Sequence, residues 1–169
     1  GVLTETWLSD NILDSQVALT GYWTIRSDRN NRTTHKNQGV GLIIYINDKW
    51  CDQGAIISTH SEPTLEMMAV RLRPYWLPRE FPCVIVLVVY CTVFAAPSSS
   101  VVKEANRKIH DAITTLERGN PQAVIIALGD FNSSAITLPH FDQQVSCSTR
   151  GDKTLDKCYV NIKHSYKSV

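Results

Sequence analysis

The chain has 169 residues and a mass of 19.0 kDa, which is the size of one domain with a substantial hydrophobic core. Hydrophobic residues make up 43% and charged residues 20%, as is ordinary for a soluble globular protein. The formal charge of +1 does not by itself indicate a nucleic-acid partner, and it is compatible with a local basic face.

The cysteines indicate a reducing compartment. There are five of them, none with CxxC spacing, so neither a disulfide framework nor a zinc site fits. The longest apolar run, Cys83 to Cys91, is too short to span a membrane, and no signal peptide is present. We therefore expect an intracellular protein, nuclear or cytoplasmic, with no membrane partner. Because the chain begins at Gly1 and not at methionine, we also expect it to be cut from something longer.

Short β-prone segments fill the first half of the chain. Polar residues or prolines separate them, which favours an antiparallel meander. Ser9-Asp10 could cap a short helical turn, and the polar stretch Ser27 to Gln38 must be a loop. The expected strands are Val2 to Thr4, Gly21 to Arg26, Gly39 to Ile46, Ala55 to Thr59 and Leu65 to Arg71.

The second half contains the strongest signals. Cys83 to Tyr90 predicts a central buried strand, and Val124 to Leu128 predicts a strand buried on both faces that Gly129 ends. Between them, an apolar face at helical spacing that includes Val101 predicts a helix over Val101 to Arg118, with Ser100 as its N-cap. A helix between two buried strands is a crossover unit, and it favours setting both carboxyl ends at one edge of a parallel sheet. One more strand is expected over Lys153 to Val160, which gives a single α/β domain over residues 1–169.

Polar side chains stand at the ends of these strands. Glu5, Tyr90, Asp130 with Asn132, and Asp156 would supply hard oxygen ligands and a proton-transfer group. Carboxylates with few histidines suit Mg²⁺ or Mn²⁺, as in phosphoester chemistry. A simpler structural explanation also exists for these residues. For example, Asp130 and Asn132 are typical turn residues.

A loop rich in basic residues is the candidate contact to a phosphate backbone. It carries Arg29 and Arg32, and Arg26 stands directly beside it. A solvated run of charges explains the same loop equally well.

Several motifs together resemble the endonuclease/exonuclease/phosphatase superfamily. They are Thr4-Glu5-Thr6-Trp7-Leu8, Gly39-Val40-Gly41-Leu42, Val89-Tyr90, Gly129-Asp130-Phe131-Asn132 and Thr154-Leu155-Asp156, in the family's order. Tyr75 to Phe81 and Thr149-Arg150-Gly151 are similar, more narrowly, to the apurinic-like endonuclease domain of LINE-type (non-LTR) retrotransposons.

The resemblance implies a four-layer α/β sandwich of two packed mixed sheets with flanking helices, here without the family's first and last strands. It also implies cleavage of a DNA phosphodiester that depends on Mg²⁺ or Mn²⁺, with no obligate protein partner. By motif, Glu5 resembles the metal-binding glutamate and Asp130 the aspartate that positions or deprotonates the attacking water. Asn132 and Tyr90 resemble the groups near the phosphate, and Asp156 resembles the aspartate that orients a catalytic histidine.

The chain departs from the family at its end. The family's Ser-Asp-His stretch does not occur in the 169 residues, and none of the five histidines stands in that context. We therefore expect the activity of this chain to be impaired. Two alternatives remain open: a phosphatase or phosphodiesterase that acts on small phosphoesters, and a non-catalytic remnant that only folds or binds.

Overall fold

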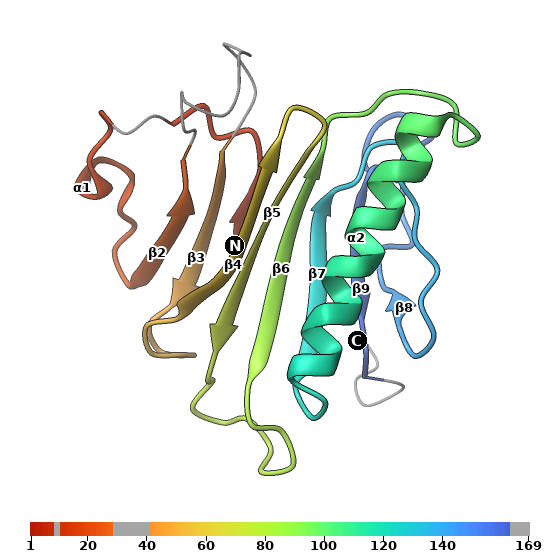
Figure 1. Ribbon diagram of the computed structural model, residues 1–169. Helices are drawn as coiled ribbons and strands as arrows, with labels where there is room; N and C mark the ends of the chain where they lie inside the picture. The colour runs from red at the N-terminus through yellow and green to blue at the C-terminus, as the bar shows by residue number, and fades with distance from the viewer. Residues whose placement is uncertain (9–10, 29–40, 163–169) are drawn as a thin grey trace.

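Two β-sheets pack face to face in the computed structural model, which describes residues 1–8, 11–28 and 41–162 (Figure 1). One sheet is three-stranded, in the order β1-β3-β2, and the other is six-stranded, in the order β4-β5-β6-β7-β9-β8. The elements of the first sheet are β1 (Val2–Leu3), α1 (Asp14–Val17), β2 (Tyr22–Ser27) and β3 (Leu42–Asn47). Those of the second are β4 (Ala55–Glu62), β5 (Leu65–Leu72), β6 (Val84–Cys91), α2 (Ser100–Gly119), β7 (Val124–Asp130), β8 (Asp142–Gln143) and β9 (Asp156–Val160).

The expected α/β sandwich is confirmed, with a helix outside each sheet. Alternate residues of β6 divide between two cores: Leu87 packs toward α2, whereas Val88 packs toward the three-stranded sheet. The short helix α1 lies on the outer side of the three-stranded sheet, where the Tyr45 hydroxyl donates to the carbonyl of Val17 at 2.7 Å. This helix begins at Asp14, after the position that Ser9-Asp10 predicted, and those two residues lie outside the described ranges. The layers are therefore α1, three-stranded sheet, six-stranded sheet and α2.

The long helix α2 covers the outer face of the six-stranded sheet (Figure 1). Two details of its prediction were wrong. The N-cap is Ser99, whose hydroxyl accepts the amide of Val102 at 3.3 Å, so Ser100 is already helical. Val101 is 46% exposed, because the apolar stripe that faces the sheet begins at Val102.

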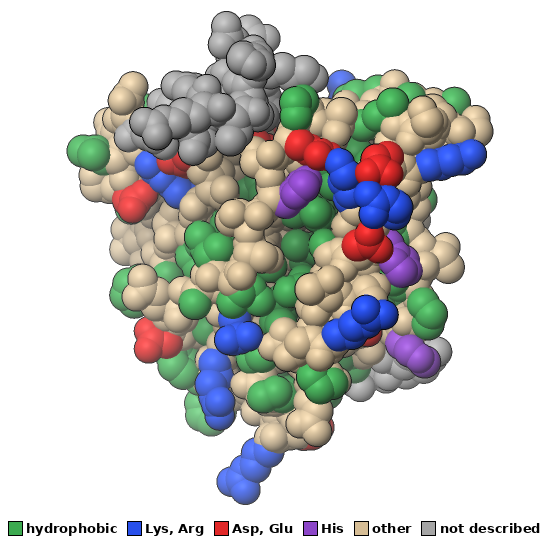
Figure 2. Space-filling view, in the orientation of Figure 1, with side chains coloured by type: hydrophobic (Ala, Val, Ile, Leu, Met, Phe, Trp, Pro, Cys, Tyr) green, Lys and Arg blue, Asp and Glu red, His purple; other side chains and the backbone are tan. Residues whose placement is uncertain are grey.

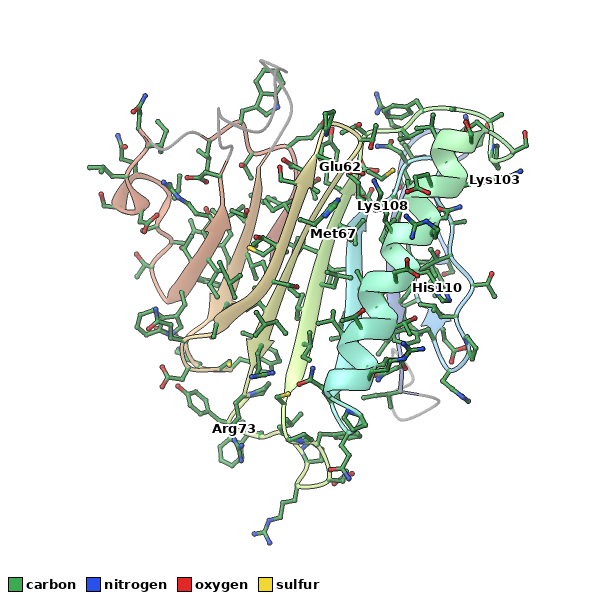
Figure 3. The ribbon with its side chains drawn as sticks, viewed as in Figure 1. Glu62, Met67, Arg73, Lys103, Lys108 and His110 are labelled. Carbon is green, nitrogen blue, oxygen red and sulfur yellow. The ribbon has the colours of Figure 1, made fainter. Side chains whose placement is uncertain are left out.

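An apolar groove runs beside α2 on the same outer face, of ≈ 640 Å³ (Figure 2). Met67 lines it, and a salt bridge of 2.7 Å between Lys108 and Glu62 joins α2 to β4 at its rim (Figure 3). No helix in the described part of the chain is long and apolar enough to cross a membrane.

The crossover prediction is confirmed: β6, α2 and β7 form a parallel unit, and Tyr90 lies opposite Asp130. However, Gly129 does not end the strand. β7 continues through Gly129 to Asp130, and Ile126 and Leu128 on its inner face are only half-buried. Strand β9 then pairs antiparallel with β7, which sets Asp156 opposite Asp130.

Candidate active site

A row of polar residues crosses one end of the six-stranded sheet. Ser61, Glu66, Tyr90, Asp130 and Asp156 are direct neighbours on five successive strands, from β4 to β9. Directly opposite residues point to the same face of a sheet. Tyr90 belongs to the core between the two sheets, so the row faces the three-stranded sheet. On the central strands, the next residues on the same face, such as Val88, are apolar. The row therefore lies at the end of the core between the two sheets.

Glu5 reaches this row from the other sheet. It follows β1, and its Oε1 accepts a hydrogen bond from the hydroxyl of Tyr90, 85 positions along the chain. Its φ of 53° lies in the left-handed region, which is rare for a residue with a side chain. The structure thus brings Glu5, Tyr90 and Asp130 together, as the strand-end pattern anticipated.

The electrostatics of this group are dominated by burial and by the nearby carboxylates. Burial raises the pKa of Asp130, the amide of Asn132 lowers it, and repulsion from Asp156 and Glu5 raises it further. Burial and the bond to Glu5 raise the pKa of the Tyr90 hydroxyl far above its usual range. Tyr90 is therefore a hydroxyl donor at neutral pH. Asp130 exchanges its proton at a higher pH than an exposed aspartate does.

Asn132 sits in the turn after β7. Its φ is 47°, and its backbone amide donates to Oδ1 of Asp130 at 2.9 Å. The side chain is 97% removed from solvent, with Nδ2 donating to the carbonyl of Cys91. Its Oδ1 is buried and has no hydrogen-bond partner among the described residues. A buried acceptor without a partner is unusual, and it calls for a donor or a cation at this position.

A cavity of ≈ 820 Å³ opens beside Asn132. Its walls include the exposed ring of Phe94 and the side chains of Arg150 and Lys153. These two residues pair through their backbones across a tight turn, where the amide of Arg150 donates to the carbonyl of Lys153 at 3.0 Å. Arg150 also lowers the pKa of Asp130. The cavity therefore presents positive charge beside Asn132, which favours an anionic ligand.

Asp156 is exposed, and the segment before β9 fixes its backbone. The hydroxyl of Thr149 accepts the amides of Leu155 and Asp156, at 2.9 and 3.1 Å. The structure thus places Asp156 at the rim of the group, next to Asp130.

Lys157 supports the row from the opposite face of the sheet. Its ammonium donates to the carbonyl of Ser134 and lies 5.8 Å from the centre of the Phe131 ring. Burial lowers its pKa, whereas Cys91 and Asp130 raise it. Lys157 therefore holds the turn that carries Asn132.

Of the three arginines expected to contact a phosphate backbone, only Arg26 lies within the described residues. The guanidinium of Arg26 is engaged inside the protein, with Asp14 at 3.0 Å and Asp28 at 2.8 Å, and its side chain is only 15% exposed. These ion pairs compensate its positive charge. Arg29 and Arg32 lie outside the described residues.

The site offers hard oxygen donors of the kind that a divalent cation needs. No group of three or more His, Cys, Asp or Glu side chains gathers as a metal cluster in residues 1–8, 11–28 and 41–162. Magnesium needs fewer: it is held by one or two carboxylates and keeps several waters. The carboxylate of Glu5 and the unpartnered oxygen of Asn132 are hard donors, and their chemistry fits such an ion.

Two members of this region, Glu66 and Lys157, were not predicted from the sequence. Glu66 lies within the apolar run of β5, and only its register opposite Tyr90 reveals that it belongs to the row. Lys157 follows Asp156 directly, and period-two alternation could have placed it on the opposite face.

Comparison with known proteins gives the fold. No protein-family model matches the chain, and no curated protein matches it. Solved structures do match, and those described below are remote in sequence. The catalytic domain of human Nocturnin with bound sulfate anion has a TM-score of 0.62 at 13% identity, covering 95% of this chain and 68% of that one.

Two structures of TDP2 are similar. The D. rerio protein complexed with single-strand DNA product has a TM-score of 0.59 at 9% identity, covering 99% of this chain and 72% of that one. The truncated Caenorhabditis elegans protein has a TM-score of 0.56 at 12% identity, covering 94% and 69%. Identities this low establish the fold alone, which is the α/β sandwich that the chain shares with these structures.

Proposed function

We propose that this chain, which has the endonuclease/exonuclease/phosphatase fold, hydrolyses phosphodiester bonds of DNA with the help of a divalent cation. The observation that carries the proposal is the meeting of Glu5, Tyr90 and Asp130 at one end of the sandwich, although Glu5 belongs to a different sheet. The similarity to a TDP2 complexed with single-strand DNA product supports a nucleic-acid substrate.

Asp130 is the proposed general base. It takes a proton from a water that attacks phosphorus, while the bond from phosphorus to the leaving oxygen breaks. Burial raises its pKa, which strengthens the ionised carboxylate as a base. Its Oδ1 is fixed by the amide of Asn132, so the carboxylate has one defined direction.

Tyr90 and Asn132 are the proposed polar groups beside the phosphate. The hydroxyl of Tyr90 stays protonated and so acts as a donor. The amide side chain of Asn132 lies at the cavity, where Arg150 and Lys153 offset the charge of a neighbouring phosphate. By its motif, Asp156 resembles the aspartate that orients a catalytic histidine, and we propose this orienting role for it at the rim of the site.

Mg²⁺ or Mn²⁺ is the proposed cofactor. Glu5 would hold it, with Asn132 Oδ1 as a second donor, and the ion would supply charge stabilisation at the phosphoryl oxygens. From the Tyr75–Phe81 and Thr149–Gly151 motifs, we further propose an origin in a LINE-type retroelement.

Nicking of supercoiled plasmid tests the function. We expect nicking in Mg²⁺ or Mn²⁺ and none in EDTA. We expect Asp130→Asn to lower the rate by about 10²–10⁴-fold, the usual contribution of a general base. Asp142→Asn is the matched control, because Asp142 lies on the edge strand β8 and is exposed.

Each outcome separates the alternatives. Turnover of bis(p-nitrophenyl) phosphate without plasmid nicking would favour an enzyme of small phosphoesters. A cooperatively folding chain with no turnover of either substrate would refute the proposal and leave a non-catalytic protein. Nicking that survives Asp130→Asn would assign the activity to another residue.

Binding of the cation is tested without turnover. Magnesium at 100 times its dissociation constant should stabilise the fold by about 2.7 kcal/mol. This stabilisation is measured as a rise in melting temperature, and Glu5→Gln should abolish the rise. An equal shift in both proteins would place the ion elsewhere.

A further inference from the structure

The buried carboxyl group of Glu66 has no part in the proposed chemistry. Its side chain is 95% removed from solvent at the inner face of β5, and the inward residues that follow it, Met68 and Val70, are fully apolar. No salt bridge holds it within the described part of the chain. Removing a carboxylate from water is costly unless hydrogen bonds replace the hydration. Such a residue therefore needs a specific reason to be there.

The hydrogen bonds of Glu66 lead to the other sheet. Its Oε2 accepts the backbone amide of Gly41 at 2.9 Å, and this bond is fully buried. The carbonyl of Gly41 in turn accepts the amide of Thr6 at 3.2 Å. Thr6 follows Glu5, whose carboxylate accepts the hydroxyl of Tyr90. Tyr90 lies directly opposite Glu66 on the neighbouring strand, which closes the ring of contacts.

Gly41 is where the segment that contains Thr6 approaches the backbone most tightly among these contacts. Its φ is 112°, and a methyl group on it would lie 2.4 Å from the hydroxyl oxygen of Thr6. Only glycine allows the two segments to approach this closely. The close approach is what lets one residue join Glu66 on one side to the Glu5 segment on the other.

The Glu5 segment needs such an anchor. Both Glu5 and Trp7 have positive φ, at 53° and 58°. Left-handed backbone at residues with side chains persists only where surrounding contacts hold it. β1 is two residues long and supplies little of that support.

We propose that Glu66 is a positioning residue of the candidate site, which holds Glu5 against Tyr90 through the backbone of Gly41. The proposal rests on the proposed function for its consequence in catalysis, whereas its structural part stands independently. Burial raises the pKa of Glu66, and the Gly41 amide and the Ser61 hydroxyl lower it by favouring the charged acceptor. Glu66 does not touch the reacting atoms; it sets where Glu5 lies.

The test compares Glu66→Leu with the isosteric Glu66→Gln. Amide hydrogen exchange of Gly41 is read by NMR, together with the side-chain signals of Glu5 and Tyr90. We expect Glu66→Leu to speed Gly41 exchange at least about tenfold and to shift both side-chain signals, since the charge-assisted bond is lost. Glu66→Gln keeps an acceptor, so it should speed exchange only severalfold and leave Glu5 and Tyr90 in place. Glu62→Gln is the control, because Glu62 bonds to Lys108 at the outer groove.

Unchanged Gly41 exchange and unchanged Glu5 and Tyr90 signals in a folded Glu66→Leu protein would overturn the proposal. If that variant fails to fold, Glu66→Gln decides alone, and an unaltered Gly41 amide shift and exchange rate would overturn it. Where the wild type nicks plasmid, Glu66→Leu should lower kcat more than about tenfold with little change in KM, and Glu66→Gln should restore most of it. A wild type without nicking would refute the proposed function, while the NMR readout would still decide the role of Glu66.

Discussion

Replacing Gly129 by alanine tests the close contact of the two central strands. Gly129 has a φ of 141° and lies opposite Val89 in the parallel pair of β6 and β7. A methyl group on it would meet the carbonyl oxygen of Val89 at 2.0 Å and its carbonyl carbon at 3.0 Å. Both atoms belong to backbone, so no side chain can move aside, and the strands must separate.

The expected loss of stability follows from two contributions. Unfavourable positive φ costs an L residue about 1–3 kcal/mol, and forcing extra volume into a packed core costs about 1–3 kcal/mol. Together they give about 4 kcal/mol, a large part of the roughly 5–15 kcal/mol that stabilises a domain. At about 2–4 °C per kcal/mol for a chain of this length, the melting temperature should fall by about 8–16 °C.

Thermal unfolding followed by circular dichroism or calorimetry measures this loss. Gly119→Ala is the matched control, because Gly119 ends α2 and an added methyl group would meet no atom within 4 Å. Alanine is also the better helix former, so this control should unfold at the same temperature or slightly higher. A melting temperature of Gly129→Ala within about 2 °C of wild type would refute the strand contact, since that range corresponds to less than about 1 kcal/mol.

Three further substitutions test the site and the helix. Because burial and neighbouring carboxylates raise the pKa of Asp130, its ionisation opposes folding, so the stability it contributes is present below its ordinary pKa of 3.8 and is lost as pH rises. In EDTA, Asp130→Asn should therefore melt above wild type at pH 7, and the difference should shrink toward pH 4; a difference that grows on acidification would contradict this. Lys157→Met removes the ammonium that bonds to the Ser134 carbonyl, so it should lower nicking activity while the protein still unfolds cooperatively. Unchanged activity would show that Lys157 does not support the turn that carries Asn132. Ser99→Ala should cost about 1 kcal/mol in urea unfolding through loss of the N-cap, against less than about 0.5 kcal/mol for Ser100→Ala, and equal losses would contradict the assigned cap.

The central strands and the long helix were predictable from sequence. Val84 to Tyr90 is apolar without interruption, which only a doubly covered strand can satisfy, and the structure buries all of it. The crossover rule then gave the parallel pairing and hence the neighbourhood of Tyr90 and Asp130. The helix start was misplaced by one residue, because Ser99 and Ser100 are chemically equivalent caps and only backbone geometry distinguishes them.

Charged residues were harder to predict. Arg26, proposed as a contact to a phosphate, forms ion pairs with Asp14 and Asp28 in the structure. A cation in a polar stretch carries no sequence signal for whether its partner is external or internal. Glu66 escaped notice for a related reason: a single acid within an apolar strand resembles a surface residue until the register of its neighbours is known.

The sequence alone determined the central strands and which edge of the six-stranded sheet carries Tyr90 and Asp130, because strand and helix periodicity and crossover handedness are local properties of the chain. Only the tertiary structure decided through which hydrogen bonds Glu5 contacts Tyr90 and Glu66 contacts Gly41. Those contacts join two different sheets, and the way one sheet packs on another depends on the volumes of the side chains between them. No local pattern in the chain encodes that packing, so the closure of the site could be seen only in three dimensions.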